Sequence, residues 1–237
     1  MRFLMRALVC GLFCIFGLTV HADTLPGASE YLFMVVSNGN DVTRQGSGVL
    51  VQSNKILTNC HVVADAERVV AVRLDGKKVN VTGISADAFH DACTLQIDAS
   101  LPGAVRQSRF TSDGDEVVAV GYPSAKAVFS AAKVVNANAK LNGEDVILTS
   151  NYCAPGISGG PLFNKDGELV GLLFAGNSVT KSCAAIPIDQ ARRSMNLFAF
   201  FASNVVWTKK TRDTKPWCSC TNGASRWCAC TSEAPRS

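Results

Sequence analysis

Charged residues are scarce in this chain of 237 residues. Only 18% of the residues are charged, and the formal net charge is +4. The sequence has no dense stripe of lysine and arginine, which argues against the electrostatic footprint of a nucleic-acid-binding protein. With 47% hydrophobic residues, the chain can build one two-lobed domain with a sizeable core. We therefore expect no nucleic acid among its partners.

Long apolar runs are also lacking. The run at 8–20 follows Arg2 and Arg6 and precedes a small residue, Ala22. This is the pattern of a cleaved signal peptide, and the run is too short for a comfortable membrane span. We assign 1–22 to a signal peptide, with an uncleaved anchor as the alternative. The mature protein is then secreted or periplasmic, without a stable membrane span, and loses two arginines, so its charge falls from +4 to +2.

Cysteine is abundant by comparison, with ten residues, of which Cys10 and Cys14 lie in the predicted signal peptide. A lipid anchor at either is disfavoured because the bulky Val9 and Phe13 precede them. An even number behind an export signal indicates disulfide bonds, whereas a cytosolic protein with such cysteines more often binds a metal. The disulfide candidates are Cys60, Cys93, Cys153, Cys183, Cys218, Cys220, Cys228 and Cys230.

Short apolar runs with turn signals every 8–12 residues extend from about 28 to 187. Runs at 31–36, 69–74 and 169–174 are examples. The turn signals between the runs are Asn38-Gly39, Asp75-Gly76, Asp113-Gly114, Asn142-Gly143 and Asp166-Gly167. This pattern predicts an all-β protein, either a barrel or a sandwich. A gap at 99–113 is suited to joining two halves.

The end of the chain has a different pattern. Apolar residues at helical spacing, with Asp189 placed to start a helix, predict a C-terminal helix over about 189–202. Residues 208–216 are polar and basic and indicate a linker. A Trp-Cys-x-Cys-Thr motif then occurs twice, at 217–221 and 227–231. We interpret it as a small disulfide-knotted hairpin; a four-thiolate metal site, which export disfavours, and a loose or intermolecularly paired tail stay open.

Glycines surround one serine at 156–162 (GISGGPL). A nucleophilic serine needs a base for its proton and donors for the developing oxyanion, and glycines let backbone N–H groups approach a substrate closely. Taken alone, the string also fits a glycine-rich hairpin turn. It fits the nucleophile elbow of α/β-hydrolases too, but that fold needs a histidine after the serine. None of the three histidines follows Ser158, so that fold is excluded.

The base must therefore precede Ser158. His21 lies in the predicted signal peptide. His90 adjoins Asp91, and neighbours on an extended chain point to opposite faces, so these two cannot easily form an oriented pair. We predict that His61, where a strand runs into a turn, is the base.

Asp91 is the predicted orienting acid. It heads an apolar strand, where a buried carboxylate without a partner would be costly. A hydrogen bond from His61 would offset that cost and fix the imidazole tautomer. The alternatives are Asp87, in a predicted loop, and Asp98, after the strand.

Three motifs together resemble the trypsin-like serine proteases, and most closely their bacterial Do/HtrA-type branch. They are 58–63 (TNCHVV), 91–95 (DACTL) and 156–162 (GISGGPL), in the order His, Asp, Ser. The strings at 167–171 (GELVG) and 185–187 (AIP) match the same branch. The likeness covers about residues 30 to 200.

The resemblance implies an all-β, chymotrypsin-like fold of two perpendicular six-stranded antiparallel β-barrels, with a catalytic triad in the cleft. The triad would be His61, Asp91 and Ser158, and the backbone N–H groups of Gly156 and Ser158 would form the oxyanion hole. The implied activity is that of an exported serine endopeptidase, which hydrolyses a protein or peptide substrate through an acyl-enzyme. We expect no cofactor and no metal.

The resemblance also places a substrate pocket. Its residues would be Tyr152, Cys153, Phe174, Ala175 and Gly176. No acidic residue stands where it would select lysine or arginine, so we expect the pocket to take a small or medium aliphatic residue. If the base touches the acid, Cys60 should lie near Cys93. A Cys153–Cys183 bond would close one side of the pocket.

Two features depart from the family pattern. Ile157 stands where the digestive branch has Asp and the Do/HtrA-type branch usually Asn, so we predict no zymogen activation by an ion pair with a new N-terminus. No PDZ-like domain is expected, because only about 30 residues follow residue 205. The predicted organisation is a signal peptide at 1–22, a protease domain at 23–205 with barrels at about 28–100 and 110–188, and a linker with the Trp/Cys-repeat tail at 206–237.

Two other functions stay open at this stage. A protease-fold binding protein without turnover is one, because Ile157 could collapse the oxyanion hole. The second gives the main role to the tail as an adaptor for an unknown partner. Trp217 and Trp227 motivate it, because large apolar residues in a polar region often mark a contact surface.

Overall fold

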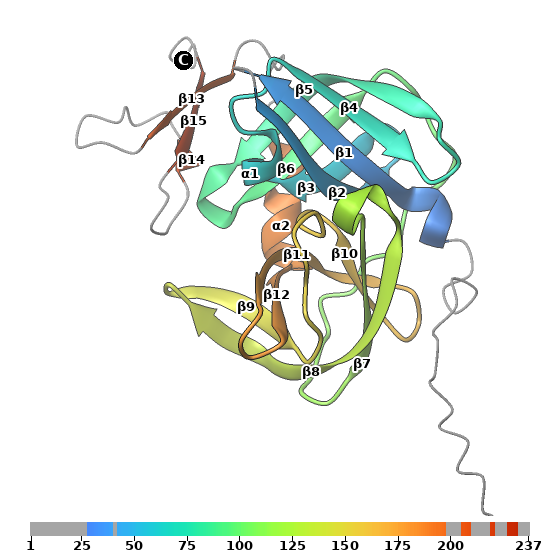
Figure 1. Cartoon of the computed structure of the whole chain (residues 1–237), viewed down its shortest axis with the longest axis vertical. Helices are drawn as coiled ribbons and strands as arrows, with labels where there is room; N and C mark the ends of the chain where they lie inside the picture. The colour runs from blue at the N-terminus through green and yellow to red at the C-terminus, as the bar shows by residue number, and fades with distance from the viewer. Residues whose placement is uncertain (1–27, 40–41, 198–204, 210–218, 221–226, 232–237) are drawn as a thin grey trace, which may run out of the picture.

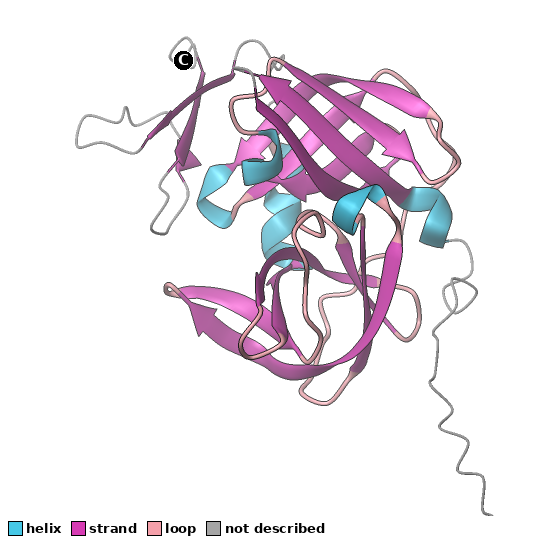
Figure 2. Ribbon diagram, in the orientation of Figure 1, coloured by secondary structure: helices cyan, strands magenta, loops and turns pink. Residues whose placement is uncertain are grey.

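In a computed structural model, the chain forms two closed antiparallel β-barrels that lie next to each other (Figure 1). The structure describes residues 28–39, 42–197, 205–209, 219–220 and 227–231. The prediction of two six-stranded barrels is confirmed, and strands dominate the described chain (Figure 2). The predicted signal peptide at 1–22 lies outside the described residues. Within those residues, no helix has the length and apolar character needed to cross a membrane.

The first barrel has the spatial strand order β1-β2-β3-β6-β5-β4 and closes by pairing of β1 with β4. Its strands are β1 (Leu32–Gly39), β2 (Val42–Gln52), β3 (Lys55–Asn59), β4 (Arg68–Arg73), β5 (Lys78–Asp87) and β6 (Ala92–Ile97). Phe33, Ile56 and Leu95 are fully buried in its core. The turn expected at Asn38-Gly39 is displaced, because both residues still pair within the β1–β2 hairpin.

The second barrel has the order β10-β11-β12-β9-β8-β7 and closes by pairing of β10 with β7. Its strands are β7 (Glu116–Gly121), β8 (Val128–Leu141), β9 (Glu144–Thr149), β10 (Pro161–Asn164), β11 (Leu169–Asn177) and β12 (Ser182–Pro187). The predicted turn Asn142-Gly143 joins β8 to β9, with both residues at positive φ (54° and 91°), as a tight hairpin requires.

A shared core joins the two barrels. Leu32, Val49 and Leu57 of the first barrel cluster with buried residues of the second, among them Phe163 and Leu172. Residues between β6 and β7 connect the barrels, as the gap at 99–113 predicted. The candidate functional residues lie at the junction of the barrels, so this apolar contact sets their relative position.

The C-terminal helix is shorter than predicted. It consists of α2 (Ile188–Ala191) and the 3₁₀ turn η5 (Arg192–Asn196). The chain is extended at Leu197 (φ −83°, ψ 155°), so the prediction that the helix continues through 197 is wrong, and residues 198–202 lie outside the described residues. The hydroxyl of Ser194 donates to the carbonyl of Ala191 and shares a hydrogen bond with Thr94 of β6 (2.8 Å). These bonds tie the turn to the first barrel.

The last described strands form a separate sheet. The strands β13 (Val205–Lys209), β14 (Ser219–Cys220) and β15 (Trp227–Thr231) have the order β13-β15-β14. The start of the predicted linker, Thr208 and Lys209, therefore lies in a strand. Strands β14 and β15 lie against the 3₁₀ turn η3 (Ala88–His90), and β14 also lies against β5.

Candidate active site

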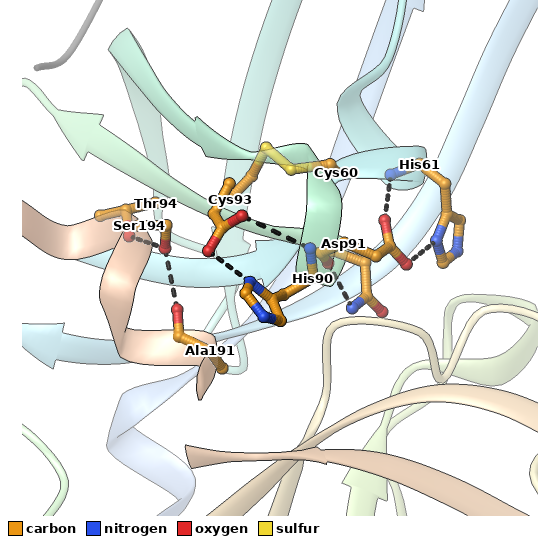
Figure 3. The surroundings of a disulfide bond; sticks show 10 residues. Cys60, His61, His90, Asp91, Cys93, Thr94, Ala191 and Ser194 are labelled. Atoms are coloured by element: carbon orange, nitrogen blue, oxygen red, sulfur yellow. Dashed lines mark hydrogen bonds and ion pairs between the residues drawn. A yellow bond between two sulfur atoms is a disulfide. The ribbon is translucent and has the colours of Figure 1, made fainter. Parts of the chain in front are cut away.

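His61 and Asp91 form a close pair at the edge of the first barrel. His61 lies in the single-turn helix α1 (Cys60–Val63), directly after β3. Its Nδ1 is 2.7 Å from Oδ2 of Asp91, and its backbone N–H donates to Oδ1 at 2.9 Å (Figure 3). The two contacts use both carboxylate oxygens. They fix the direction of the ring and assign the proton to Nδ1 when the ring is neutral.

The backbone of Asp91 is in the left-handed region (φ 52°, ψ 35°). This conformation is uncommon outside glycine, although Asp tolerates it better than most residues. Neighbouring bonds support it: the carbonyl of Asp91 accepts from Nδ2 of Asn59 (2.9 Å) and from the backbone N–H of Cys60 (3.2 Å). Asp91 and the start of α1 are thus linked through both backbone and side chain.

A disulfide bond lies directly behind this pair. Cys60 precedes His61, Cys93 follows Asp91 by two residues, and the two cysteines are bonded with a Cα–Cα distance of 4.9 Å (Figure 3). Both sulfurs lie in the fully buried core of the first barrel. The pairing that the motifs imply is present, and it covalently joins helix α1, which carries the histidine, to strand β6, which follows the aspartate.

Ser158 lies in the loop before β10, and Ser47 of β2 holds this loop. The backbone N–H of Ser47 donates to the carbonyl of Ser158, and its hydroxyl donates to the carbonyl of Gly156, both at 2.8 Å. Gly156 and Gly159 have positive φ (98° and 84°), which glycine adopts without strain. Because β2 belongs to the first barrel, these bonds fix the serine loop of the second barrel against the first.

The backbone N–H groups near Ser158 differ in whether a protein acceptor takes them. The N–H of Ile157 donates to the carbonyl of Ala154 at 3.2 Å. Among the described residues, no acceptor takes the N–H of Gly156 or of Ser158. These are the two groups that the resemblance assigns to the oxyanion hole, so their hydrogen-bonding capacity is left for another partner.

The hydroxyl of Ser158 donates to the carbonyl of Phe174 at 3.4 Å. Within the described ranges, no hydrogen bond links this hydroxyl to the ring of His61. The two residues nevertheless flank one glycine: a Cβ built at Gly46 would lie 2.6 Å from Cγ2 of Val62, the neighbour of His61, and 2.9 Å from the carbonyl oxygen of Ser158. Catalytic hydrogen bonds are often long in free enzymes and tighten with substrate.

Two of the residues expected to form the pocket contact each other, and a third, Phe174, accepts the hydroxyl of Ser158. Gly176 packs on Cys153, because a Cβ at 176 would lie 2.1 Å from the carbonyl oxygen of Cys153. Cys153 is bonded to Cys183 of β12, with a Cα–Cα distance of 5.2 Å, as implied by the motifs. Phe174 and Ala175 are half-buried in β11. Tyr152 is 41% exposed, and the ammonium of Lys181 lies 5.4 Å from its ring centre.

Four effects set the pKa of His61. Partial loss of hydration beside neighbouring groups is the largest effect and lowers the pKa, although 44% of the side chain is exposed. The charge of Arg44 lowers the pKa further. The charge of Asp91 and its hydrogen bond to the ring raise it. The net result is a pKa above the ordinary value of 6.5, because the carboxylate contact outweighs the other two effects. Asp91 therefore makes His61 a stronger base.

Two residues that organise the site, Ser47 and Arg44, lie in no motif that predicts them from the sequence. Ser47 also accepts the backbone N–H of Tyr122 (2.9 Å), so one buried hydroxyl links β2 to the residue after β7 and to the serine loop. Arg44 donates to the carbonyl of Ala64, next to α1, and lies 3.6 Å from Asp65. Both are on β2, and their only sequence signal is proximity to the Gly46 and Gly48 positions.

The local geometry assumed for His90 and Asp87 is wrong. His90 is not on an extended chain but in η3, and its Nδ1 lies 2.7 Å from Oδ2 of Asp87. Asp87 is not in a loop but ends β5, and it caps η3 by accepting the backbone N–H of His90. Asp98 accepts from the backbone and side chain of Asn80, at the far end of β6. The structure brings neither aspartate to His61.

Ile157 is buried in the core of the second barrel, with 4% of its surface exposed. It packs against β7, where a Cβ at Gly121 would lie 2.6 Å from Cγ1 of Ile157. The residue that departs from the family pattern therefore fills an apolar site. Its side chain anchors the peptide between Gly156 and Ser158 in that core.

Known proteins are similar to this chain in sequence and in architecture. The sequence profile of the trypsin-like peptidase domain family matches residues 46–172, just over half of the chain. A protein of Halomonas elongata named "Probable periplasmic serine endoprotease DegP-like" is 32% identical over 157 residues, which cover 62% of this chain and 33% of that protein. A protein of the same name from Hahella chejuensis is 35% identical over 163 residues, covering 64% of this chain and 34% of the relative. The chain thus spans about a third of the length of these relatives.

Solved structures give the same result. The crystal structure of the serine endoprotease from Yersinia pestis is 26% identical, with a TM-score of 0.65, and the match covers 73% of this chain and 64% of that one. The active form of the Rv3671c protease from M. tuberculosis is 20% identical, with a TM-score of 0.66, and covers 74% of this chain and 85% of that one. At that lower identity, the second likeness concerns the fold alone.

Proposed function

Because the chain belongs to the trypsin-like peptidase domain family, we propose that it is an exported serine endopeptidase with Ser158 as nucleophile, His61 as base and Asp91 as orienting acid. The observation that carries the proposal is the 2.7 Å contact between Nδ1 of His61 and Oδ2 of Asp91. It leaves Nε2 as the proton acceptor of a neutral ring. Two relatives named as periplasmic support export, as does the signal-peptide pattern at 1–22.

Acylation requires proton transfer away from the serine. In the proposed reaction, Oγ of Ser158 breaks its bond to the Phe174 carbonyl and turns toward Nε2 of His61. Nε2 takes the hydroxyl proton while Oγ attacks the carbonyl carbon of the scissile peptide bond. Asp91 stabilises the imidazolium that forms. The imidazolium then gives its proton to the leaving amine, and the acyl group stays on Ser158.

The developing oxyanion needs fixed donors. We assign this role to the backbone N–H groups of Gly156 and Ser158, which the described protein groups leave without an acceptor. Loss of one such donor typically costs 10²–10³ in kcat. A water molecule then repeats the sequence with His61 as base and releases the acid product. Ser47 supports both donors indirectly through its two bonds to the loop.

The preferred substrate follows from the walls of the pocket. Phe174 and Ala175 are half-buried and offer apolar surface, and the buried Cys153 lies against Gly176. Lys181 at the rim adds positive charge near Tyr152, which disfavours a basic side chain. We propose cleavage after a small or medium aliphatic residue. Profiling with a peptide library tests this, and cleavage mainly after lysine or arginine contradicts it.

A second candidate is a protease-fold binding protein without turnover. The bond from the hydroxyl of Ser158 to the carbonyl of Phe174 favours it, because a hydroxyl held there is not activated by His61. Burial of Ile157 gives no further support, since the donors at Gly156 and Ser158 stay available. The adaptor role of the tail stays a prediction from the sequence.

One experiment separates the two candidates. The mature chain, its Ser158→Ala variant and its His61→Ala variant are treated with a fluorophosphonate probe, and a peptide library is digested in parallel. An active peptidase gives rapid labelling of the wild type, none of Ser158→Ala, and a loss of about 10⁶ in kcat for either variant. Folded wild-type protein that neither reacts with the probe nor cleaves the library identifies the binding protein instead.

A further inference from the structure

A second histidine–carboxylate cluster lies one residue away from Asp91. His90 is nearly buried, with 12% of its side chain exposed, and its Nδ1 lies 2.7 Å from Oδ2 of the equally buried Asp87 (Figure 3). On the other side of the ring, Nε2 lies 3.8 Å from Oε2 of Glu144. The proposed chemistry uses none of these three residues, and the trypsin-like motifs do not include them.

The cluster connects the two barrels. Asp87 ends β5 and His90 lies in η3, both in the first barrel, whereas Glu144 begins β9 in the second. The ring therefore sits between carboxylates that belong to different barrels. The edge of the Phe89 ring packs on it, with ring centres 4.8 Å apart.

The cluster also controls the turn that ends at Asp91. Asp87 accepts the backbone N–H of His90, and the N–H of Asp91 donates to the carbonyl of Ala88 (3.3 Å). This tight turn delivers the chain into the left-handed conformation of Asp91 (φ 52°). Such a conformation lasts only where the surroundings determine it. The bonds from Asn59 and Cys60 hold the carbonyl of Asp91, and the bond from His90 to Asp87 holds the turn that precedes it.

We propose that His90 is a positioning residue for the triad: its bond to Asp87 fixes η3 and thereby the carboxylate of Asp91, and its contact with Glu144 sets η3 against the second barrel, which carries Ser158. Only the expected fall in kcat rests on the proposed peptidase function. The structural part of the proposal, the orientation of Asp91 toward His61, holds with or without turnover.

Two isosteric substitutions separate the two contacts of the ring. His90→Asn places a side-chain amide near the position of Nδ1 and keeps the reach to Asp87, but not to Glu144. His90→Gln places an amide near Nε2 and keeps the reach to Glu144, but not to Asp87. His90→Ala removes both. Asp87→Asn removes the carboxylate that His90 contacts. Asp98→Asn removes a carboxylate at the other end of β6 and is its matched control.

We expect kcat to fall about tenfold or more in His90→Gln, His90→Ala and Asp87→Asn with little change in KM, since small misplacements of catalytic groups cost up to about 10²-fold. His90→Asn is expected to recover most of this loss, and Asp98→Asn to match the wild type. The downfield proton NMR resonance of the His61–Asp91 hydrogen bond should weaken in the first three variants and return in His90→Asn. If folded His90→Gln has the same kcat and the same His61–Asp91 resonance as the wild type, the proposal is wrong.

The NMR measurement distinguishes this proposal from the proposed function. If the wild type has no peptidase activity, the proposed function fails, but the resonance still reports whether His90 orients Asp91. If the wild type is active and the resonance is unchanged in every His90 variant, the positioning role fails and the proposed function stands.

The register of the tail sheet carries a second, independent inference. Cys220 of β14 and Cys228 of β15 are direct partners in an antiparallel pair, as are Ser219 and Ala229. Directly opposed residues have Cα atoms about 4.5–5.5 Å apart, within the 4.4–6.8 Å that a disulfide allows. Diagonal partners are about 7–8 Å apart, beyond that range. On its other side β15 faces Val206 and Thr208 of β13, which supply no cysteine.

We infer that Cys220 and Cys228 form a cross-strand disulfide, which selects one connectivity among the three that four tail cysteines allow. In the oxidising compartment, one thiolate attacks a disulfide-bearing oxidant to form a mixed disulfide, and the second thiolate displaces the reduced oxidant. The two cysteines lose two protons and two electrons, and the oxidant leaves as a dithiol. This bond would close the hairpin of the Trp-Cys-x-Cys-Thr repeat.

Peptide mapping of the exported Ser158→Ala protein tests this inference, because that variant does not digest itself. The protein is alkylated and digested without reduction; cleavage after Arg226 separates the two motifs, and fragmentation of the linked peptides assigns the partners. The expected result is a bond between Cys220 and Cys228. A bond of Cys220 to Cys218 or Cys230, free thiols at these positions, or one zinc ion per chain overturns it.

Discussion

Asp91 contacts His61 twice, once through each carboxylate oxygen: Oδ1 accepts the backbone N–H at 2.9 Å, and Oδ2 lies 2.7 Å from Nδ1. The backbone contact fixes the position of α1 relative to β6, and the side-chain contact fixes the imidazole ring. Removal of the negative charge should therefore change the protonation of the His61 ring more than the position of His61.

Asp91→Asn is expected to lower kcat about 10⁴-fold while the fold stays intact, as in the corresponding change in a related protease. The asparagine amide can donate to Nδ1 and so favour the wrong tautomer. The variant also loses the charge that raises the pKa of His61, while burial still lowers that pKa. The acidic limb of kcat/KM against pH should therefore move below that of the wild type. An unchanged kcat, or a limb that moves upward, contradicts the assigned role.

Arg44→Gln is expected to have the opposite effect on the pH profile. The positive charge of Arg44 lowers the pKa of His61, so its removal should raise that pKa and move the acidic limb of kcat/KM to higher pH. Activity near pH 6.5 then falls, while activity at pH 9 changes little. Arg68→Gln, an exposed change on β4, is the control. Coincident limbs for Arg44→Gln and the wild type would show that this charge does not reach the ring.

The raised pKa of His61 also has a consequence for stability. A folded-state pKa above the unfolded value of 6.5 means that the folded protein binds the proton more tightly. The resulting stabilisation is complete below pH 6.5 and is lost as the pH rises through the folded-state pKa. Substitution of His61 by alanine removes this one contribution to the pH dependence.

Much of the fold follows from short signals in the sequence. Turn dipeptides such as Asp75-Gly76 and Asp166-Gly167 have glycine at positive φ, and alternating burial in β1 follows its apolar run. Strand β8 was harder to predict, because most of its 14 residues are exposed or half-buried and form no apolar run. Its length comes from pairing with both β7 and β9, which is a tertiary effect.

The triad candidates were predictable because each sits in a short motif, whereas their supporting residues were not. Ser47 acts through bonds to residues more than 70 positions away, and no local pattern reports such contacts. The misjudged pair was His90 and Asp87, because a 3₁₀ turn brings residues three apart together while an extended chain does not. The helix over 189–202 was overestimated, because periodicity alone does not show where Leu197 leaves the helix.

Gly159→Ala is expected to prevent folding of the serine loop, and Gly143→Ala is its matched control. Both glycines have positive φ (84° and 91°), so alanine costs roughly 1–2 kcal/mol at either position. Only at Gly159 would the added Cβ also strike protein atoms, 2.2 Å from the carbonyl oxygen of Ser47 and 2.3 Å from Oγ1 of Thr58. Urea denaturation should show a modest loss for Gly143→Ala. Equal losses for the two variants would contradict the contact between the loop and β2.

Joint replacement of Cys60 and Cys93 by alanine is expected to separate stability from catalysis. The disulfide closes a loop with a sequence separation of 33, so its loss should lower the free energy of unfolding by roughly 2–4 kcal/mol. The noncovalent bonds from Asn59 and from the residue-60 backbone to Asp91 do not depend on sulfur. We therefore expect kcat within a few-fold of the wild type at low temperature. A large fall in kcat in the folded variant would assign the bond a direct part in orienting the triad.

Burial of Ile157 predicts that this protein needs no new N-terminus for activity. The position is 4% exposed in an apolar core, and an isoleucine side chain carries no charge to pair with an ammonium. Extension of the mature N-terminus by one residue should leave kcat/KM unchanged, and a large loss would refute this account. Ile157→Val should cost about 0.5–1.5 kcal/mol of unfolding free energy. Ile157→Asp should cost several kcal/mol, because its carboxylate would be buried without a partner.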